Sequence, residues 1–296
     1  MHIPVLQKEV IEYLDPKPNE NFVDCTVDGG GHTLSILEKT KPGGKILGID
    51  FDSVILETTR GKIEDSEYKG RFIAANDNFA NLKNIADKNN FKNISGILFD
   101  LGYSSWHLEE SKRGFSFQKN ESLDMRYSVQ GDLSAEKIVN LWPREEIERI
   151  LKEYGEEEFS KSIAKNIVKE RKGKLLETTL DLVSVVEKSV PGWYRHQKIH
   201  FATKTFQALR IAVNDELSNI EKALPQALEI LEKGGRMAVI SFHSLEDRIV
   251  KNFLKNKEKG NYITILTKKP ITPSQEEIEN NPRARSAKMR SAIKVK

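Results

Sequence analysis

Residues 24–32 read Asp-Cys-Thr-Val-Asp-Gly-Gly-Gly-His and decide the fold of this chain. An apolar, strand-like run precedes the three glycines, and a helical pattern follows them. Asp50 ends the next strand-like run, about 20 positions after Gly30. Glycine at a strand-to-helix turn lets the backbone approach a ligand closely, and an acidic side chain that far along the chain reaches ribose hydroxyls. The pattern therefore predicts a binding site for an adenosine-containing cofactor.

The same turn favours a cofactor without phosphates. The third glycine of the dinucleotide fingerprint is missing, because Leu34 occupies its position, and this disfavours NAD. Asp28 and His32 suit a cofactor such as S-adenosylmethionine, whose amino acid end carries both charges. A glycine cluster by itself is equally typical of an ordinary tight turn in an α/β protein, so the interpretation also depends on the residues that follow.

Composition describes a chain that can bury a large core. It has 296 residues, of which 38% are hydrophobic and 31% charged, enough for one large domain or two. No apolar run approaches the roughly 20 residues that cross a bilayer, and the opening Met-His-Ile-Pro lacks the order of a signal peptide. We expect a soluble protein of the cytoplasm. The single cysteine, Cys25, cannot form an internal disulfide and is interpreted as a small buried hydrophobe.

Two stretches lack acidic residues, although the net charge of the chain is only +3. They are residues 188–214, which mix basic and aromatic side chains, and residues 282–296. Basic groups neutralise phosphates and aromatic faces stack on unpaired bases, so this mixture suits RNA better than a membrane. A solvated basic surface is the alternative for either stretch. The candidate RNA contacts in them are Arg195, Lys198, Lys204, Arg210, Arg283 and Arg285.

The first hundred residues alternate between strand-like and helical patterns, which is typical of a parallel sheet with helices on both faces. We expect strands over residues 21–27, 45–50, 71–75 and 94–100, and helices over residues 33–39, 53–63 and 80–89. Ligands of such sheets bind beyond the carboxyl ends of the strands. The glycine turn, Asp50, residues 76–79 and Asp100 all fall there, so four loops are predicted to converge on one crevice.

The middle of the chain has a different pattern. After Asp100 comes a long stretch rich in serine, glycine and aromatic residues, followed only by helical patterns to about Gly192. The predicted organisation is one α/β domain in two parts, residues 1–110 and 206–296, with an all-helical domain over residues 111–205 inserted between them.

The sheet is predicted to resume after this insertion. An apolar stripe from Phe206 to Leu224 predicts one long helix. Further strands are expected over residues 236–242, 262–267 and 292–296.

Asp100 is the candidate catalytic residue, because it ends an apolar strand that points into the predicted crevice. Methyl transfer from a sulfonium needs a nucleophile in line with the methyl group, and an exocyclic base amine is a weak one because its lone pair is delocalised. A carboxylate that accepts the hydrogens of the amine localises the lone pair and can receive the proton. Capping of the following turn is the alternative role of Asp100.

A second polar cluster follows the strand expected over residues 236–242. Contiguous Ser241, His243 and Asp247 rarely reach the geometry of a hydrolase triad. Ser244 and Asp247 instead predict a helix N-cap at Ser244, which leaves His243 free to face the crevice. The six histidines show no ligand spacing and one cysteine cannot build a zinc site, so no metal is expected.

Several motifs resemble those of the bacterial small-subunit rRNA methyltransferase H family (RsmH, also MraW), in order from start to end. They are residues 2–6, 30–32, 100–102, 113–117, 123–126, 202–210, 241–248 and 281–286. The resemblance implies an S-adenosylmethionine-dependent enzyme that methylates the exocyclic N4 of a cytidine in the decoding region of 16S rRNA, in the small ribosomal subunit. It also implies a Rossmann-like methyltransferase sheet, interrupted by a helical domain that recognises the substrate.

The resemblance further implies which residues contact the cofactor. By position these are Gly30, Gly31, His32, Asp50, Phe79, Asp100 and His107. Two positions depart from the family pattern. Asp28 stands where the family usually has glycine and adds a negative charge to the turn. His107 stands where glutamine is usual, so a hydrogen bond there depends on tautomer and pH.

Our hypothesis for the substrate is that the cytidine turns out of its stack into a pocket lined by some of Tyr103, Trp106, Phe115 and Phe117. Phe115 and Phe117 fit core packing equally well. Arg113 and Arg126 are expected to hold phosphates. The rival interpretations are a methyltransferase of another RNA, of a protein or of a small molecule, and a non-catalytic RNA-binding protein of ribosome assembly.

Overall fold

Two compact units make up the chain. The computed structural model describes residues 4–102 and 104–296. Met1–Ser104 and Leu217–Lys296 form the first unit, here called the sheet unit, and Ser105–Glu216 form the second, the helical unit. The sequence predicted these boundaries after residues 110 and 205. Within the described ranges, no helix is long and apolar enough to cross a membrane.

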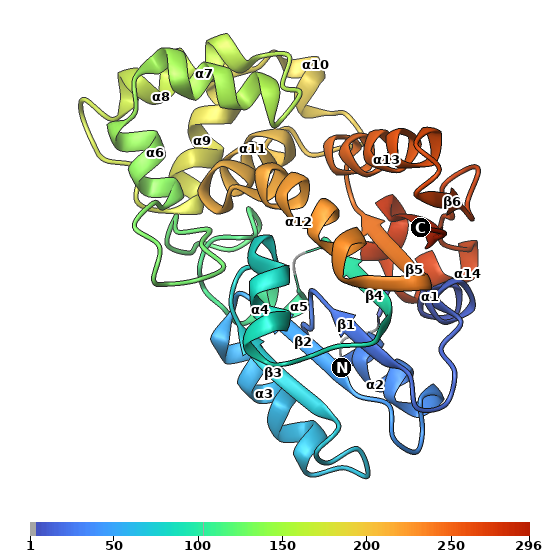
Figure 1. Cartoon of the computed structure of the whole chain (residues 1–296). Coiled ribbons are helices and arrows are strands. Elements are labelled where there is room, and N and C mark those ends of the chain that lie inside the picture. Colours follow the sequence, from blue (N-terminus) through green and yellow to red (C-terminus); the bar gives the residue numbers. More distant parts are fainter. Residues whose placement is uncertain (1–3, 103) are drawn as a thin grey trace. The chain divides into compact units, whose positions relative to one another are not determined.

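The sheet unit is built on seven strands in the order β3-β2-β1-β4-β5-β7-β6 (Figure 1). The strands are β1 (Asn21–Asp24), β2 (Ile46–Asp50), β3 (Phe72–Asn76), β4 (Ile94–Asp100), β5 (Leu231–Ser241), β6 (Ile263–Ile265) and β7 (Lys288–Lys294). The first five strands in this order pair in parallel, and β7 runs antiparallel to both its neighbours. The alternation of strands and helices in the first hundred residues is therefore confirmed.

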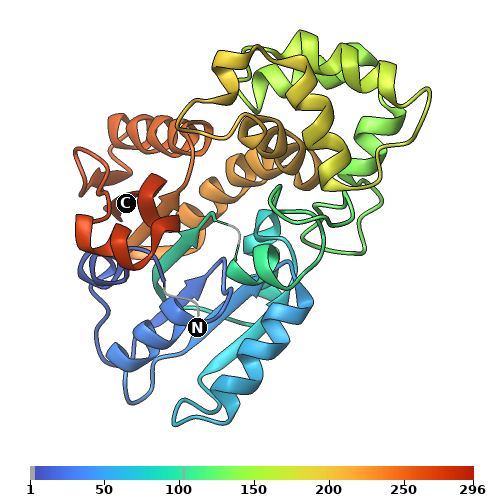
Figure 2. The same ribbon diagram turned by 180° about the vertical axis from the view of Figure 1, so that it is seen from behind.

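Helices cover both faces of this sheet, because its central strands are apolar on both sides. On one face, β1 and β4 pack through Val23, Ile97 and Phe99 against α4 (Leu82–Lys88), α12 (Glu216–Ile230) and α13 (Ser244–Lys259). On the other face lie α1 (Gln7–Leu14), α2 (Gly31–Lys39) and α3 (Ser53–Glu64). Figure 2 shows α2 and α3 in front of the strands.

The basic C-terminal stretch is part of the folded sheet unit. It forms the short helix η2 (Pro282–Ser286), which follows α14 (Gln275–Asn280), and then β7. On β7, the Arg290 guanidinium pairs with Asp247 at 2.6 Å, and Lys294 Nζ donates to the carbonyl oxygen of Leu231 at 2.6 Å. These two cations therefore link β7 to α13 and to β5.

The helical unit has no strand among its described residues and packs around one apolar core. Its helices are α5 (Ser105–Glu109), α6 (Ala135–Leu141), α7 (Arg144–Glu153), α8 (Ser160–Glu170), α9 (Thr179–Ser189), α10 (Gly192–Arg195) and α11 (Thr203–Asn214). Ile147, Ile150 and Leu151 of α7 meet Ile163 and Ile167 of α8 in that core. The predicted insertion of helices into the sheet domain is confirmed.

One expected helix is wrong in its extent. The apolar stripe from Phe206 to Leu224 belongs to two helices, α11 and α12, because Asp215 between them has a left-handed backbone with φ of 51°. Asn214, the last residue of α11, uses its side chain to donate to Met125 O at 2.8 Å and to accept from Tyr127 N at 2.9 Å. The boundary between the two units falls at this break.

Candidate functional site

The glycine turn joins β1 to α2 at the carboxyl edge of the sheet. Gly30 has φ of 80° and precedes the first residue of α2. A Cβ added to Gly30 would lie 2.6 Å from Thr59 Cγ2 on α3, and one added to Gly31 would lie 2.9 Å from Pro4 Cγ. Both glycines are therefore required by close packing within the protein, in addition to any approach of a ligand.

Asp50 ends β2 beside this turn. Its Oδ2 accepts the backbone N–H of Asp28 at 2.9 Å and its Oδ1 accepts that of Asp52 at 2.9 Å. Burial raises the pKa of Asp50 to about 7, although these two N–H groups oppose the shift, and the nearby carboxylates of Asp28 and Asp52 raise it further. The carboxyl group of Asp50 therefore changes its charge near neutral pH.

Phe79 follows β3 and supplies an aromatic ring at the same edge. It begins the short helix η1 (Phe79–Asn81), which Asn78 caps by accepting the N–H of Ala80 at 2.8 Å. The ring of Phe79 packs edge-on against Phe99 of β4, with 5.7 Å between the ring centroids. The cap and the ring contact together fix where this side chain lies.

Asp100 ends β4 and lies beside His32 of α2. Asp100 Oδ2 is 3.5 Å from His32 Nε2, and both side chains are largely buried. Asp100 N donates to Thr26 Oγ1 at 2.7 Å, which fixes the strand end. Among the described residues, neither ring nitrogen of His32 nor Asp100 Oδ1 has a hydrogen-bond partner. Buried polar atoms are normally hydrogen-bonded, so these three atoms favour a polar ligand at this position.

Asp24 is a buried carboxyl that the sequence did not single out. It is fully shielded from solvent and accepts hydrogen bonds from Thr33 Oγ1 at 2.6 Å and from Thr26 N at 3.2 Å. Burial raises the pKa of Asp24 to about 6, which the Thr33 hydroxyl and the charge of His32 partly oppose. Its signal in the sequence was the position at the end of a strand, shared with Asp50 and Asp100.

The four turns carry acidic side chains but no lysine or arginine. Residues 24–32, 50–54, 76–81 and 100–102 contain six aspartates and no lysine or arginine. Carboxylates repel the negative charge of a pyrophosphate, whereas they stabilise a sulfonium cation. The turns at the carboxyl ends of β1, β2, β3 and β4 therefore fit a cationic cofactor better than a dinucleotide.

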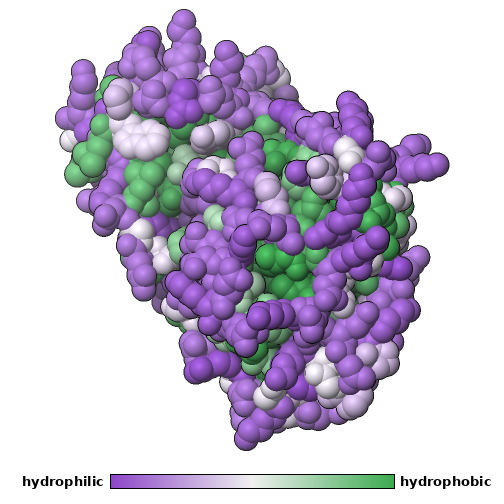
Figure 3. Space-filling view, in the orientation of Figure 1, coloured by the Kyte–Doolittle hydropathy of each residue, from purple (hydrophilic) through white to green (hydrophobic). Residues whose placement is uncertain are grey.

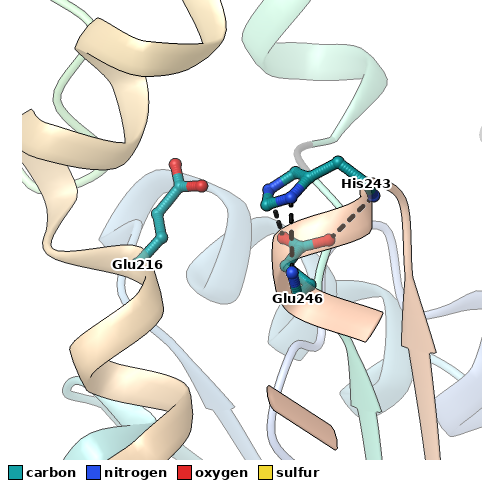
Figure 4. Close-up of side chains that lie close together, drawn as sticks. All are labelled: Glu216, His243 and Glu246. Atoms are coloured by element: carbon teal, nitrogen blue, oxygen red, sulfur yellow. Dashed lines mark hydrogen bonds and ion pairs between the residues drawn. The ribbon is translucent and has the colours of Figure 1, made fainter. Parts of the chain in front are cut away.

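The sequence predicts an N-cap at Ser244 and a free His243, but this prediction is wrong. His243 is itself the N-cap of α13. Its Nδ1 accepts the N–H of Glu246 at 3.4 Å, and its Nε2 lies 3.1 Å from Glu246 Oε1 (Figure 4). The buried Glu246 carboxylate also accepts from Phe242 N at 2.7 Å. Both ring nitrogens of His243 thus face Glu246. Glu216, drawn in the same view, belongs to the helical unit.

His107 and the candidate pocket residues lie in the helical unit, except Tyr103, which is outside the described residues. The buried ring of His107 packs against Trp106, Phe115 and Tyr127, with centroids 5.4, 4.9 and 5.1 Å away. Phe117 stacks on His200 at 4.5 Å. Trp106, His107 and Phe115 therefore belong to one aromatic cluster, whereas Phe117 packs separately against His200.

Three of the candidate RNA-binding arginines make contacts within the helical unit. Arg113 donates to Tyr127 O at 2.8 Å, and Arg126 forms a two-point pair with Asp124 at 2.7 and 2.8 Å. The Arg210 guanidinium meets both oxygens of Glu216 at 2.8 and 3.0 Å. Each of these cations has a structural contact, whatever it does with RNA.

The remaining candidates differ in exposure and partners. Arg195 reaches Glu187 at 3.5 Å and Lys204 donates to Glu156 O at 3.0 Å. Lys198, Arg283 and Arg285 are exposed. RNA binding by all these residues stays a prediction.

Known proteins resemble this chain over almost its whole length. The profile of the family described as the MraW methylase family matches residues 1–295. A ribosomal RNA small subunit methyltransferase H of Sulfurihydrogenibium azorense is 47% identical over 294 residues, 99% of this chain and 99% of the relative. A protein of that name from Thermosipho melanesiensis is 47% identical over 295 residues, 99% of this chain and 98% of the relative.

The fold itself is also found among solved structures. A crystal structure of a protein from Clostridium thermocellum covers 100% of both chains with a TM-score of 0.50 and 14% identity. This likeness and the strand order confirm the predicted Rossmann-like sheet with its inserted helices. The match of the family profile over residues 1–295 and the identity to relatives of full length place this chain in the MraW methylase family.

Proposed function

We propose that this protein uses S-adenosylmethionine to methylate the exocyclic N4 of a cytidine in the decoding region of 16S rRNA. Membership of the MraW methylase family and the name of its relatives, ribosomal RNA small subunit methyltransferase H, support the reaction and the substrate. The observation that carries the proposal is the acidic, cation-free set of turns at the carboxyl ends of four parallel strands. The proposed setting is the small ribosomal subunit in the cytoplasm.

The residues at these turns fit the cofactor. Asp50 would accept the ribose hydroxyls, Phe79 would pack on the adenine, and Asp100 and His32 would meet the amino acid end with the polar atoms that lack partners. Gly30 and Gly31 form the turn beneath. His107 is the remaining proposed contact. When bound, the cofactor supplies a methyl group on a positively charged sulfur.

Asp100 is the proposed catalytic residue. Its carboxylate accepts a hydrogen of the cytidine amine, which concentrates the lone pair on the nitrogen, and it receives the proton that the amine loses. The hydrogen bond from Asp100 N to Thr26 keeps the carboxylate at the strand end. His32 at 3.5 Å lies where it assists in orienting that carboxylate.

The flipped cytidine would stack on aromatic rings of the helical unit, with Trp106, Phe115 and Phe117 as candidates. The exposed cations Lys198, Arg283 and Arg285 are the proposed phosphate contacts that the fold leaves most accessible. Arg113, Arg126, Arg195, Lys204 and Arg210 are proposed to contribute positive charge to RNA from positions fixed by their internal contacts.

The test is transfer of labelled methyl groups by pure protein to small subunits and to naked 16S rRNA from a strain that lacks the enzyme. We expect N4-methylated cytidine in the nucleoside digest by mass spectrometry. Asp100→Asn should reduce turnover far more than RNA affinity, and the exposed Asp87→Asn serves as the control. Methylation of another nucleoside or of protein would contradict the substrate, and absence of transfer would favour an assembly protein.

A further inference from the structure

Helix α8 carries a row of exposed lysines on one face. Lys161, Lys165, Lys169 and Lys172 are exposed, and the first three follow one another at four-residue steps. At about 100° per residue this spacing keeps Lys161, Lys165 and Lys169 on one side of the helix, and Lys172 follows in the turn after its last residue, Glu170. The opposite side carries Ile163, Ala164 and Ile167, which are buried in the core of the helical unit. At about 1.5 Å per residue, the three lysines within the helix extend over about 12 Å.

These lysines lack acidic partners. Within the part of the chain that the structure describes, none of the four lies within 4.0 Å of a carboxylate. On neighbouring α7, by contrast, Arg149 pairs with Glu146 at 2.9 Å and with Glu153 at 2.8 Å. Like charges four residues apart destabilise a helix. Among the described residues, the repulsion between the lysines of α8 is not offset by acidic partners. Such a row favours a partner with regularly spaced negative charges.

The surface over these helices is hydrophilic at its rim. In Figure 3 the outermost rim at the top of the helical unit, where Figure 1 places α7 and α8, is mostly hydrophilic, with hydrophobic and neutral residues below it. A polyanion matches this rim, because its phosphates replace the counterions of the lysines.

An exposed aromatic ring lies at the N-terminal end of the same helix. Trp193 is 59% exposed, and its ring packs edge-on against Phe159, the N-cap residue of α8, with 5.9 Å between centroids. It also packs against Tyr194 at 5.7 Å. The Tyr194 hydroxyl donates to the buried Glu157 carboxylate at 3.1 Å. The Trp193 side chain is therefore held in place by its neighbours while much of it remains accessible to solvent.

A second contact fixes the neighbouring end of α9 against α8. Ser162 Oγ donates to Ser189 O at 2.8 Å, and Asn166 Nδ2 donates to Ser189 Oγ at 2.9 Å. Lys188, which precedes Ser189, is exposed there and adds another cation. Ser162 and Asn166 belong to the same helix as the lysine row. The charged face is thus part of a rigid pair of helices.

We propose that Trp193 and the row Lys161, Lys165, Lys169 and Lys172, together called the α8 face, bind an unpaired segment of RNA. The lysines contact successive phosphates, and one base stacks on Trp193. A cationic row beside an exposed aromatic ring is the combination that binds single strands, since duplex bases offer no free face. That this RNA is ribosomal rests on the proposed function.

The experiment compares two triple variants with equal loss of charge. Lys161→Gln/Lys165→Gln/Lys169→Gln alters the α8 face, and Lys251→Gln/Lys255→Gln/Lys259→Gln alters lysines at the same spacing on α13. Fluorescence anisotropy with a short unstructured RNA oligonucleotide, without cofactor, gives affinity at several salt concentrations. We expect the α8 triple to reduce the slope of log affinity against log salt by about 2, since each lost phosphate contact removes about 0.7. The α13 triple should keep the wild-type slope.

Stacking is tested separately. Trp193→Ala should weaken binding of the single strand by about tenfold, and Trp193→Phe should retain most of it. Binding of the corresponding duplex should be weaker and insensitive to Trp193→Ala. Thermal melting shows whether each variant is folded.

Two results would overturn the proposal. One is an equal loss of affinity in both triples, which means that only total charge matters, and the other is a duplex that binds as tightly as the single strand. Methyl transfer to small subunits is measured in parallel. A wild-type protein that binds RNA through the α8 face but transfers no methyl group contradicts the proposed function alone. A wild-type protein that methylates, with the two triples indistinguishable, contradicts the α8 face alone.

Discussion

His32 Nε2 and Asp100 Oδ2 lie 3.5 Å apart. Each of these side chains also has a buried polar atom without a hydrogen-bond partner among the described residues. The pair brings together the first turn of α2 and the end of β4, which are far apart in the chain. An imidazole and a carboxylate so placed can hold both ends of a zwitterion, because one donates and the other accepts.

His32→Asn should therefore weaken the binding of S-adenosylhomocysteine, the demethylated product, by about tenfold, since a hydrogen bond to a charged group contributes about 1.5 kcal/mol or more. Titration calorimetry measures the affinity, and the exposed His196→Asn is the matched control. Equal affinities of both variants and the wild type would remove His32 from the cofactor site.

Product binding should strengthen as pH rises, because both carboxyl oxygens of Asp50 are free to accept the ribose hydroxyls only when the group is ionised. The pKa of Asp50 is about 7 before the ligand binds. Its ionised fraction, and with it the affinity, should fall about tenfold between about pH 8 and about pH 6. Asp24, with a pKa of about 6, titrates at the acidic end of this range. Calorimetry on Asp50→Asn should give weaker binding with a flatter profile, and an unchanged profile would contradict the role of Asp50.

Asp24→Asn should change how stability depends on pH. The folded pKa of Asp24, about 6, exceeds the unfolded value of 3.8, so the native state binds the proton more tightly. Stability is therefore lost as pH rises between these values, by up to about 3 kcal/mol. Urea unfolding measures the free energy of unfolding at about pH 5 and about pH 8. Relative to the wild type, the variant should be more stable at the higher pH than at the lower one. A constant difference would contradict the assigned ionisation.

Gly30→Ala should destabilise the protein more than Gly70→Ala. Both glycines have positive φ, 80° and 74°, but only at Gly30 does an added Cβ meet a neighbour, Thr59 Cγ2 at 2.6 Å. Gly70→Ala measures the backbone cost, about 1 kcal/mol, and the excess measures the clash. Thr59→Ser removes Cγ2 and keeps the hydroxyl that donates to Asp28 O. Denaturant unfolding of Gly30→Ala/Thr59→Ser should recover most of the excess, and no recovery would place the strain elsewhere.

The sheet and its binding edge were predictable because their signals are local. Periodicity marks apolar strands, and a polar residue directly after a strand, such as Asp50 or Asp100, falls at the edge where parallel strands end. The left-handed Asp215 was not predictable, because one residue between two amphipathic helices leaves their apolar stripes almost in phase.

Side-chain partners were the other limit. The N-cap role of His243 was missed, because serine and aspartate are the usual caps and imidazole is not. Arg210 and Glu216 are close in sequence, yet only the break at Asp215 brings them together. The lysines of α8 repeat every four residues in the sequence, but their lack of partners depends on what α7 and α9 present.

The strand order also governs how the chain is made. β4 ends at Asp100, and β5, its partner in the sheet, begins only at Leu231. During synthesis from the N-terminus, the first four strands emerge long before the fifth. The edge of β4, with Ile97, Leu98 and Phe99, therefore stays without its neighbour while the whole insertion is translated. An open apolar strand edge promotes self-association, so slow translation of the insertion prolongs the interval in which nascent chains aggregate and chaperones are needed.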